Sequence, residues 1–188
     1  MLVSPQILKS EPSVMSLEHS VTRLESLFNR LFNSSENTLL RSGAQEPFYR
    51  ASINQQPAII YSREDFFSSA LHETAHWCIA GKERRQLDDF GYWYEPDGRN
   101  AQQQAEFERV EVKPQAIEWL FSLACNHVFN FSADNLNATE SCSEEFKNKV
   151  HQQAEDYLEN GLPTRAQLFF NLLNSQFREG KKVRLPNV

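Results

Sequence analysis

Apolar residues recur with helical spacing along most of the chain, which predicts a mostly helical protein. In residues 17–32, for example, Val21, Leu24 and Phe28 fall on one side. Pro114 interrupts another such pattern. Because the residue before a proline avoids the α region, we expect a break or kink near Lys113, or else a second helix that begins at the proline. The patterns predict helices at residues 17–32, 63–80, 102–110 with Asn100 as N-cap, 114–125, 143–161 and from 163 or 164 onward.

Short extended runs lie between the first two predicted helices. Residues 38–41, 48–53 and 58–61 carry strand-like patterns and are separated by prolines and a Ser-Gly pair. The sequence therefore predicts a small sheet just before the helix at 63–80. An aromatic run at residues 89–94 is a further strand candidate.

Length and composition indicate a single globular domain. The chain has 188 residues, of which 40% are hydrophobic and 23% charged, enough to form a real core. Neither an internal repeat nor a domain boundary is visible in the sequence. We expect a flexible segment at residues 1–15 and one α+β domain at residues 16–188, mostly helical with a small β-sheet.

Charge and cysteine content narrow the functional classes. The net charge of −6 disfavours binding to a phosphate backbone, so no direct nucleic-acid partner is expected. Neither a membrane span nor a secretory signal is predicted, because no long apolar run is present. The three cysteines, Cys78, Cys125 and Cys142, form no CxxC pair and indicate no disulfide framework. We expect a cytoplasmic monomer.

The stretch His72-Glu73-Thr74-Ala75-His76 carries the strongest chemical signal. Its two histidines are four residues apart, so on a helix they share one face and can bind one divalent metal ion. The structural alternative is a pair of packed or solvated histidines. The run from Ser62 to Asp65 resembles a capping box, and Gly81 suits a C-cap, so the motif is expected within a helix.

A working metal site needs a third protein ligand and an open position. A third histidine at the HExxHxxGxxH spacing is absent, since position 82 is lysine. Asp88 and Asp89 lie in an expected loop and are weaker candidates, while His127 and His151 are interpreted as structural or surface residues. The best candidates are carboxylates of the following helix; we favour Glu111, then Glu108, over Glu106 and Glu118.

Two histidines and one carboxylate fit two chemistries. With zinc, the set is typical of a gluzincin peptidase, in which Glu73 would be the general base that deprotonates metal-bound water. With iron(II), the same ligands form the facial triad of non-haem oxygenases. The pentapeptide alone favours the peptidase.

The residues around the motif change this interpretation. Four segments of the chain closely resemble the bacterial elongation factor P hydroxylase family. They are HETAHWCIAGKERR at 72–85, DFGYWYEPDGR at 89–99, FERVEVKPQA at 107–116 and DNL at 134–136. The resemblance covers residues 66 to 136. It implies a zincin-like, metal-dependent oxygenase that hydroxylates the lysine of elongation factor P after that lysine has received a lysyl group. The family resemblance makes iron(II) the expected metal, with zinc possible as purified.

The resemblance also implies roles for particular residues. His72 and His76 match the family's metal histidines, and we assign Glu111 as the third ligand. The chain has no His-x-Asp or His-x-Glu pair, so no 2-oxoglutarate site is expected. Glu73 is expected to be catalytic, either orienting a ligand or handling protons. Candidate substrate-binding residues are Tyr92, Trp93, Asp97, Arg99 and Asp134.

A basic cluster follows the motif helix directly. Lys82, Arg84 and Arg85 would complement the helix macrodipole or, alternatively, form a docking patch for an acidic protein partner.

Overall fold

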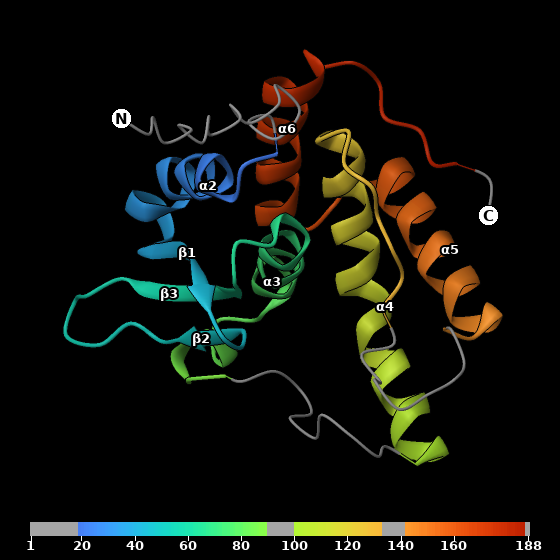
Figure 1. The fold of residues 1–188 in the computed structure, drawn as a ribbon, viewed down its shortest axis with the longest axis horizontal. Coiled ribbons are helices and arrows are strands. Elements are labelled where there is room, and N and C mark those ends of the chain that lie inside the picture. The colour runs from blue at the N-terminus through green and yellow to red at the C-terminus, as the bar shows by residue number, and fades with distance from the viewer. Residues whose placement is uncertain (1–18, 90–99, 133–141, 187–188) are drawn as a thin grey trace, which may run out of the picture.

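Helices dominate the fold, and a small sheet stands beside them (Figure 1). The computed structural model describes residues 19–89, 100–132 and 142–186. In these ranges the chain forms, in order, α2 (Val21–Glu36), β1 (Thr38–Ala44), β2 (Phe48–Arg50), β3 (Ala58–Arg63), α3 (Phe67–Ile79), a 3₁₀ turn (Arg84–Gln86), α4 (Ala101–Ala124), α5 (Glu144–Asn160) and α6 (Thr164–Arg178).

The sheet has three strands in the order β1-β3-β2. β1 pairs with β3 in parallel, with Thr38 opposite Ala58, whereas β2 pairs with β3 antiparallel, with Tyr49 opposite Ile60. Along β3 the buried side chains alternate with more exposed ones, as expected for a strand with one covered face. The expected α+β fold, mostly helical with a small sheet, is confirmed.

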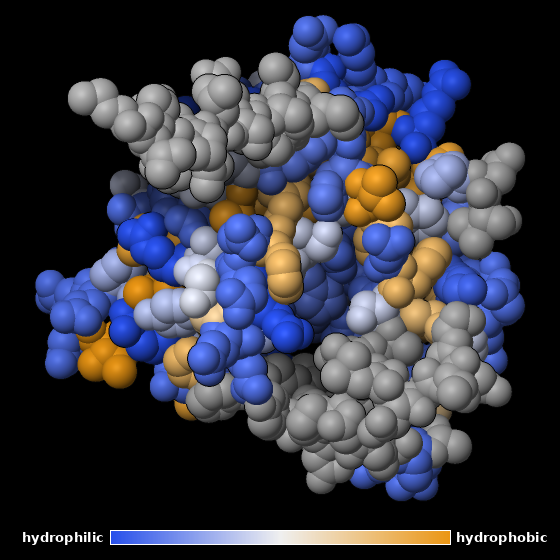
Figure 2. All heavy atoms as spheres, viewed as in Figure 1, coloured by the Kyte–Doolittle hydropathy of each residue, from blue (hydrophilic) through white to orange (hydrophobic). Residues whose placement is uncertain are grey.

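Helix α3 lies at the centre of the fold, between the sheet on one side and α4 on the other (Figure 1). It also contacts α2 and α6. Aromatic rings pack between α3 and α2. Trp77 of α3 stands edge-on to Phe28 and Phe32 of α2, with ring centroids 5.2 and 4.9 Å apart. Burial of these large apolar rings stabilises the position of α3. Among the coloured residues of the face shown in Figure 2, hydrophilic ones predominate.

Helix α4 does not break at Pro114. It runs unbroken from Ala101 to Ala124 with Pro114 inside it, so the predicted break near Lys113 is wrong. A proline inside a helix loses one hydrogen bond and costs about 3 kcal/mol. The following turns, from Gln115 through Phe121, are buried without interruption, and this packing outweighs the local cost. Asn100 is the N-cap, as predicted, and exchanges both capping-box hydrogen bonds with Gln103.

Helix α3 begins later than predicted. Ser62 is buried in β3, and the helix begins at Phe67 without a side-chain cap. Pairing with β1, which places Ala44 opposite Arg63, extends β3 to Arg63 and so overrides the local capping signal. The helix ends at Ile79, with Ala80 rather than Gly81 as its C-cap.

Other boundaries shifted by a few residues. α2 begins at Val21 and continues to Glu36, where Asn37 adopts a left-handed conformation. The second strand is shorter than predicted and the other two are longer. The helix with N-cap Ser143 and C-cap Gly161, and the last helix from Thr164, are confirmed. Of the aromatic run at 89–94 only Asp89 is described, and it forms an isolated bridge with Tyr49. None of the helices in the described ranges has the length and apolar character needed to cross a bilayer.

Arg165 of α6 closes the C-terminal end of α3. Its guanidinium donates to the backbone oxygens of Trp77 and Ala80, at 3.0 and 2.6 Å, and lies 4.8 Å from the Trp77 ring centroid. The last carbonyls of a helix have no partner within it, so this side chain satisfies acceptors that would otherwise be lost. Arg165 therefore holds the site-bearing helix against α6.

We predict that Arg165→Ala lowers the free energy of unfolding by about 1–3 kcal/mol, because it removes charged hydrogen bonds from a partly buried helix end. Urea denaturation measures this change. The matched control is Arg109→Ala, which removes an exposed arginine that pairs with Glu106 three residues away in its own helix. The control should shift the midpoint little. Equal shifts for the two variants would contradict the role of Arg165.

Candidate metal centre

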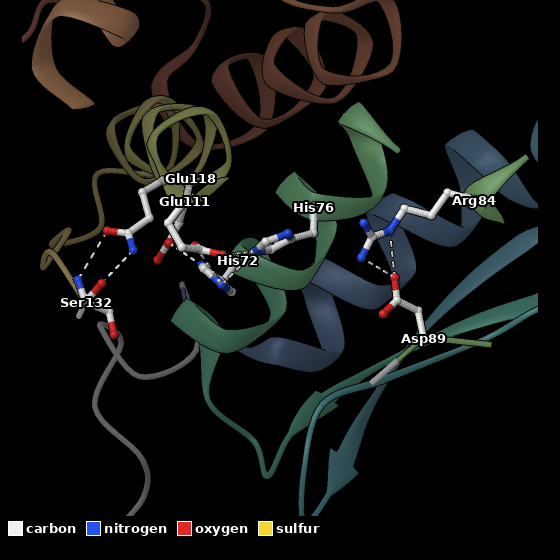
Figure 3. A network of polar contacts seen from close by, with 8 residues as sticks. His72, His76, Arg84, Asp89, Glu111, Glu118 and Ser132 are labelled. Carbon is white, nitrogen blue, oxygen red and sulfur yellow. Dashed lines mark hydrogen bonds and ion pairs between the residues drawn. The ribbon is translucent and has the colours of Figure 1, made fainter. Parts of the chain in front are cut away.

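The two histidines of the motif lie on one face of α3. His72 and His76 are one helical turn apart, and their ring centroids are 4.6 Å apart. Their Nε2 atoms face each other at 3.1 Å (Figure 3). Two nitrogens that each lie about 2.1 Å from a shared metal ion are themselves about 3.0–3.4 Å apart. The spacing of these two nitrogens therefore suits a shared ion.

Glu111 reaches the same point from α4. Its Oε1 lies 3.2 Å from Nε2 of His76, and its Oε2 lies 3.8 Å from Nε2 of His72. One donor atom from each of the three residues lies within 4.8 Å of the others. Glu111 is only 4% exposed, whereas both histidines remain partly open. Catalytic metal sites share this arrangement, in which three protein ligands hold the ion and one coordination position stays open.

The chemistry of the cluster fits a divalent cation. Oε2 of Glu111 is buried and has no hydrogen-bond partner among the described residues. A buried carboxylate oxygen without a partner is costly, and a metal ion would satisfy it. Imidazole nitrogen and carboxylate oxygen are ligands for zinc and for non-haem iron alike. The cluster can therefore hold a divalent metal, without selecting between these two.

The pKa values in the cluster show how strongly its charges interact. Burial alone would lower the pKa of His72, but Glu118, Glu111 and Glu73 raise it to about 10. Burial would raise the pKa of Glu111, but His76, His72 and the amide of Gln115 lower it to about 2. Three carboxylates thus surround two imidazoles, and their excess negative charge attracts cations.

Glu118 lies behind His72, on the side away from His76. Its Oε2 accepts a hydrogen bond from Nδ1 of His72 at 2.8 Å, and the carboxylate is 9% exposed (Figure 3). The sequence placed Glu118 among the candidate third ligands. In the structure its carboxylate contacts Nδ1 of His72, whereas Nε2 is the nitrogen that faces His76. Its spacing of seven residues from Glu111, which puts both on one helix face, is the signal that could have indicated a supporting role.

Gln115, one turn after Glu111, was missed by sequence reasoning. It is 1% exposed and joins α4 to the backbone of Ser132 in both directions: Nε2 donates to the carbonyl at 2.7 Å, and Oε1 accepts from the N–H at 3.2 Å. Ser132 is the last described residue before 133–141. Its position four residues after the candidate ligand Glu111 is the only sequence signal for this link.

The remaining candidate carboxylates point elsewhere. Glu106 is exposed and pairs with Arg109 at 2.6 Å. Glu108 accepts from Ser143 at 3.1 Å and from Gln104 at 3.4 Å. Of the four carboxylates on α4 proposed from sequence, only Glu111 joins the cluster of possible metal ligands.

The weaker candidates also have partners within the fold. Asp88 accepts from the backbone N–H of Ala51 at 2.8 Å, and Asp89 pairs with Arg84 at 2.6 Å. His127 lies 2.9 Å from the hydroxyl of Ser68, and burial together with His19 lowers its pKa. Nε2 of His151 lies 3.3 Å from the backbone oxygen of Pro186.

The cluster of His72, His76 and Glu111 opens into a cleft of about 1610 Å³. His72, Glu73, His76 and Glu111 line it together with residues from β2 and α5. Glu73 is partly exposed there, and burial, more than any neighbouring charge, raises its pKa. The cleft gives a side chain of another molecule room to reach the cluster.

Two of the three cations proposed for docking are paired within the protein. Arg84 pairs with Asp89 at 2.6 Å, and Arg85 pairs with Glu36 at 2.9 Å (Figure 3 shows the first pair). Of these three cations, only Lys82 is exposed, and the two arginines are half-buried. The arginines therefore have a structural use that does not require a partner protein.

All five residues proposed to bind substrate lie outside the described ranges. They are Tyr92, Trp93, Asp97, Arg99 and Asp134.

Comparison with known proteins places this arrangement in a family. A family model described as elongation factor P hydroxylase matches residues 27–185. A curated protein of Haemophilus influenzae, named elongation factor P lysine hydroxylase, is 48% identical over 152 residues, which cover 80% of this chain and 85% of that protein. Since the family model matches from within α2 to the residues after α6, and the relative's match covers 80% of this chain, this chain belongs to the elongation factor P hydroxylase family.

Proposed function

We propose that this chain is a metal-dependent hydroxylase that acts on the lysine of elongation factor P, after that lysine has received a lysyl group. Membership of the hydroxylase family carries this proposal, and the His72, His76 and Glu111 cluster supports it. The family also favours hydroxylation over the zinc peptidase activity that the HExxH pentapeptide alone suggested.

The three clustered residues would be the metal ligands. His72 and His76 present their Nε2 atoms, and Glu111 contributes a buried carboxylate that offsets part of the cation's charge. When bound, iron(II) with open positions supplies oxygen activation to such a triad. The partly exposed side of the histidines leaves the centre accessible from the cleft.

The cleft would receive the aliphatic lysyl arm. Hydroxylation replaces one C–H bond of that arm with C–OH. The second oxygen atom of dioxygen leaves as water, for which an external reductant supplies two electrons and the solvent supplies two protons. Tyr92 and Trp93 are proposed to line the path of the arm, and Asp97, Arg99 and Asp134 to orient its charged groups. These five assignments rest on the segments that resemble the family and contain them.

Glu73 is proposed to hold and transfer a proton in the cleft. It lies next to His72 in sequence, lines the cleft, and has a raised pKa because of its burial. A carboxyl group with a raised pKa takes up a proton more readily than an ordinary carboxyl group, and can both accept and return it.

Several broader features are part of the same proposal. Residues 16–188 would form one hydroxylase domain on a zincin-like scaffold. The segment at 1–15, expected from sequence to be flexible, lies outside the described residues. The protein would act as a monomer in the cytoplasm, where translation factors work.

Hydroxylation itself is tested by mass spectrometry. Iron-loaded protein, lysylated elongation factor P, dioxygen and a reductant should yield a substrate heavier by one oxygen atom on the modified lysine. His72→Ala should yield none, because one of three metal ligands is lost. An unchanged substrate mass with the fully metal-loaded protein would contradict the proposed activity.

The third ligand is tested by a pair of substitutions on α4. Glu111→Gln should weaken metal binding by more than about 100-fold, since loss of a ligand should exceed the loss of an outer partner. Glu108→Gln should leave affinity unchanged, because Glu108 contacts Ser143 and Gln104 instead. Thermal unfolding with added metal gives the readout, as saturation at 100 times Kd stabilises by about 2.7 kcal/mol. A larger effect at Glu108 would refute the assignment.

The role of Glu73 is tested by Glu73→Gln, which keeps size and removes the titrating proton. We expect kcat for hydroxylation to fall about 100-fold or more, with metal affinity retained, since Glu73 is not a proposed ligand. Steady-state kinetics and metal titration on the same sample separate the two effects. Unchanged kcat would exclude a proton-transfer role.

A further inference from the structure

The carboxylate of Glu118 has one described hydrogen-bond partner at the metal cluster, the Nδ1 atom of His72. The distance from Oε2 is 2.8 Å, and the side chain is 9% exposed (Figure 3). The cluster of possible metal ligands contains His72, His76 and Glu111 but not Glu118. Glu118 therefore has a position beside the centre that differs from that of a ligand.

This contact determines which nitrogen of His72 is free. A carboxylate accepts hydrogen bonds, so Nδ1 must carry the proton that it donates to Glu118. In the neutral imidazole Nε2 then holds the lone pair, and Nε2 is the atom that faces His76 at 3.1 Å. The hydrogen bond thus selects the tautomer and aims the ring. A carboxylate in this position also makes the imidazole a more basic ligand.

One helix face presents both the ligand and the support. Glu111 and Glu118 are seven residues apart on α4, which places them two turns apart on the same side. Both are buried, and α4 packs directly against α3. Because α4 continues through Pro114 without a break, the spacing between the two carboxylates is set by one continuous helix. The two rings of α3 therefore meet a preformed pair of acceptors.

We propose that Glu118 is a positioning residue for the metal centre, which holds His72 in the tautomer and orientation that present Nε2 to the metal ion. The inference rests on the metal site of the proposed function and adds a residue that the site does not otherwise assign. It predicts that Glu118 acts on metal binding through His72 without itself touching the ion or the substrate.

Zinc titration of the full-length protein, in competition with a chelator, measures the effect. Glu118→Ala should weaken zinc binding about 10–100-fold, the range found for outer partners of metal-bound histidines. Glu118→Gln, which preserves shape and can still accept the hydrogen bond through its amide oxygen, should recover part of this loss. The matched control is Glu106→Gln, an exposed carboxylate on the same helix, which should bind zinc as tightly as the wild type.

A second readout separates positioning from general destabilisation. In zinc-loaded wild type, proton–nitrogen NMR of the imidazoles should show His72 protonated at Nδ1, with that proton protected from exchange. Glu118→Ala should lose this protection while the pattern of His127, which lies near Ser68, stays unchanged. A merely structural role would lower the melting temperature and leave the His72 signal as it was.

The outcomes distinguish this inference from the function on which it rests. Wild type and Glu118→Ala that bind zinc equally, with the same His72 signal, would overturn the positioning role alone. Wild-type protein that binds zinc no more tightly than His72→Ala would overturn the proposed metal site and this inference together. Weaker binding in Glu118→Ala, partial recovery in Glu118→Gln and a changed His72 signal would support it.

Discussion

The packing of α3 against α4 is the contact on which the site depends. It brings two imidazoles, one turn apart, against a carboxylate from a helix thirty or more residues further along the chain. Buried carboxylates are tolerated only with partners, and here Glu111 and Glu118 face His72 and His76. Charge attraction between the helices thus opposes the cost of burying these groups, and the same charges create a place for a cation.

The rest of the fold keeps this contact in place. Aromatic packing around Trp77 holds the back of α3, and Arg165 binds the backbone at its C-terminal end. On the other side, Gln115 ties α4 to the chain at Ser132. Polar groups therefore gather on the cleft side of the two helices, while apolar groups fill the side toward α2 and α6. This division explains how a protein rich in phenylalanine can present a charged centre to solvent.

Patterns within one element were predictable from sequence, and contacts between elements were much less so. The cap Asn100, the start of a helix at Ser143 and the spacing of His72 and His76 are local features, and the structure has them as expected. The break at Pro114 was wrong because burial of the turns after it outweighs a local preference, and Ser62 was taken for a cap because strand pairing is not local. Glu118 was one of the candidate third ligands, and its contact with Nδ1 of His72 was not predictable because it depends on how the two helices pack.

The family and the cluster of three donor atoms together lead to one claim, that His72, His76 and Glu111 bind the metal ion that supports hydroxylation. A crystal structure of the metal-loaded protein, with diffraction data on both sides of the metal's absorption edge, tests this claim most directly. The account predicts one anomalous peak within bonding distance of both Nε2 atoms and the Glu111 carboxylate. A fully loaded protein with its peak at other residues, or with Glu111 turned away from the ion, would contradict it.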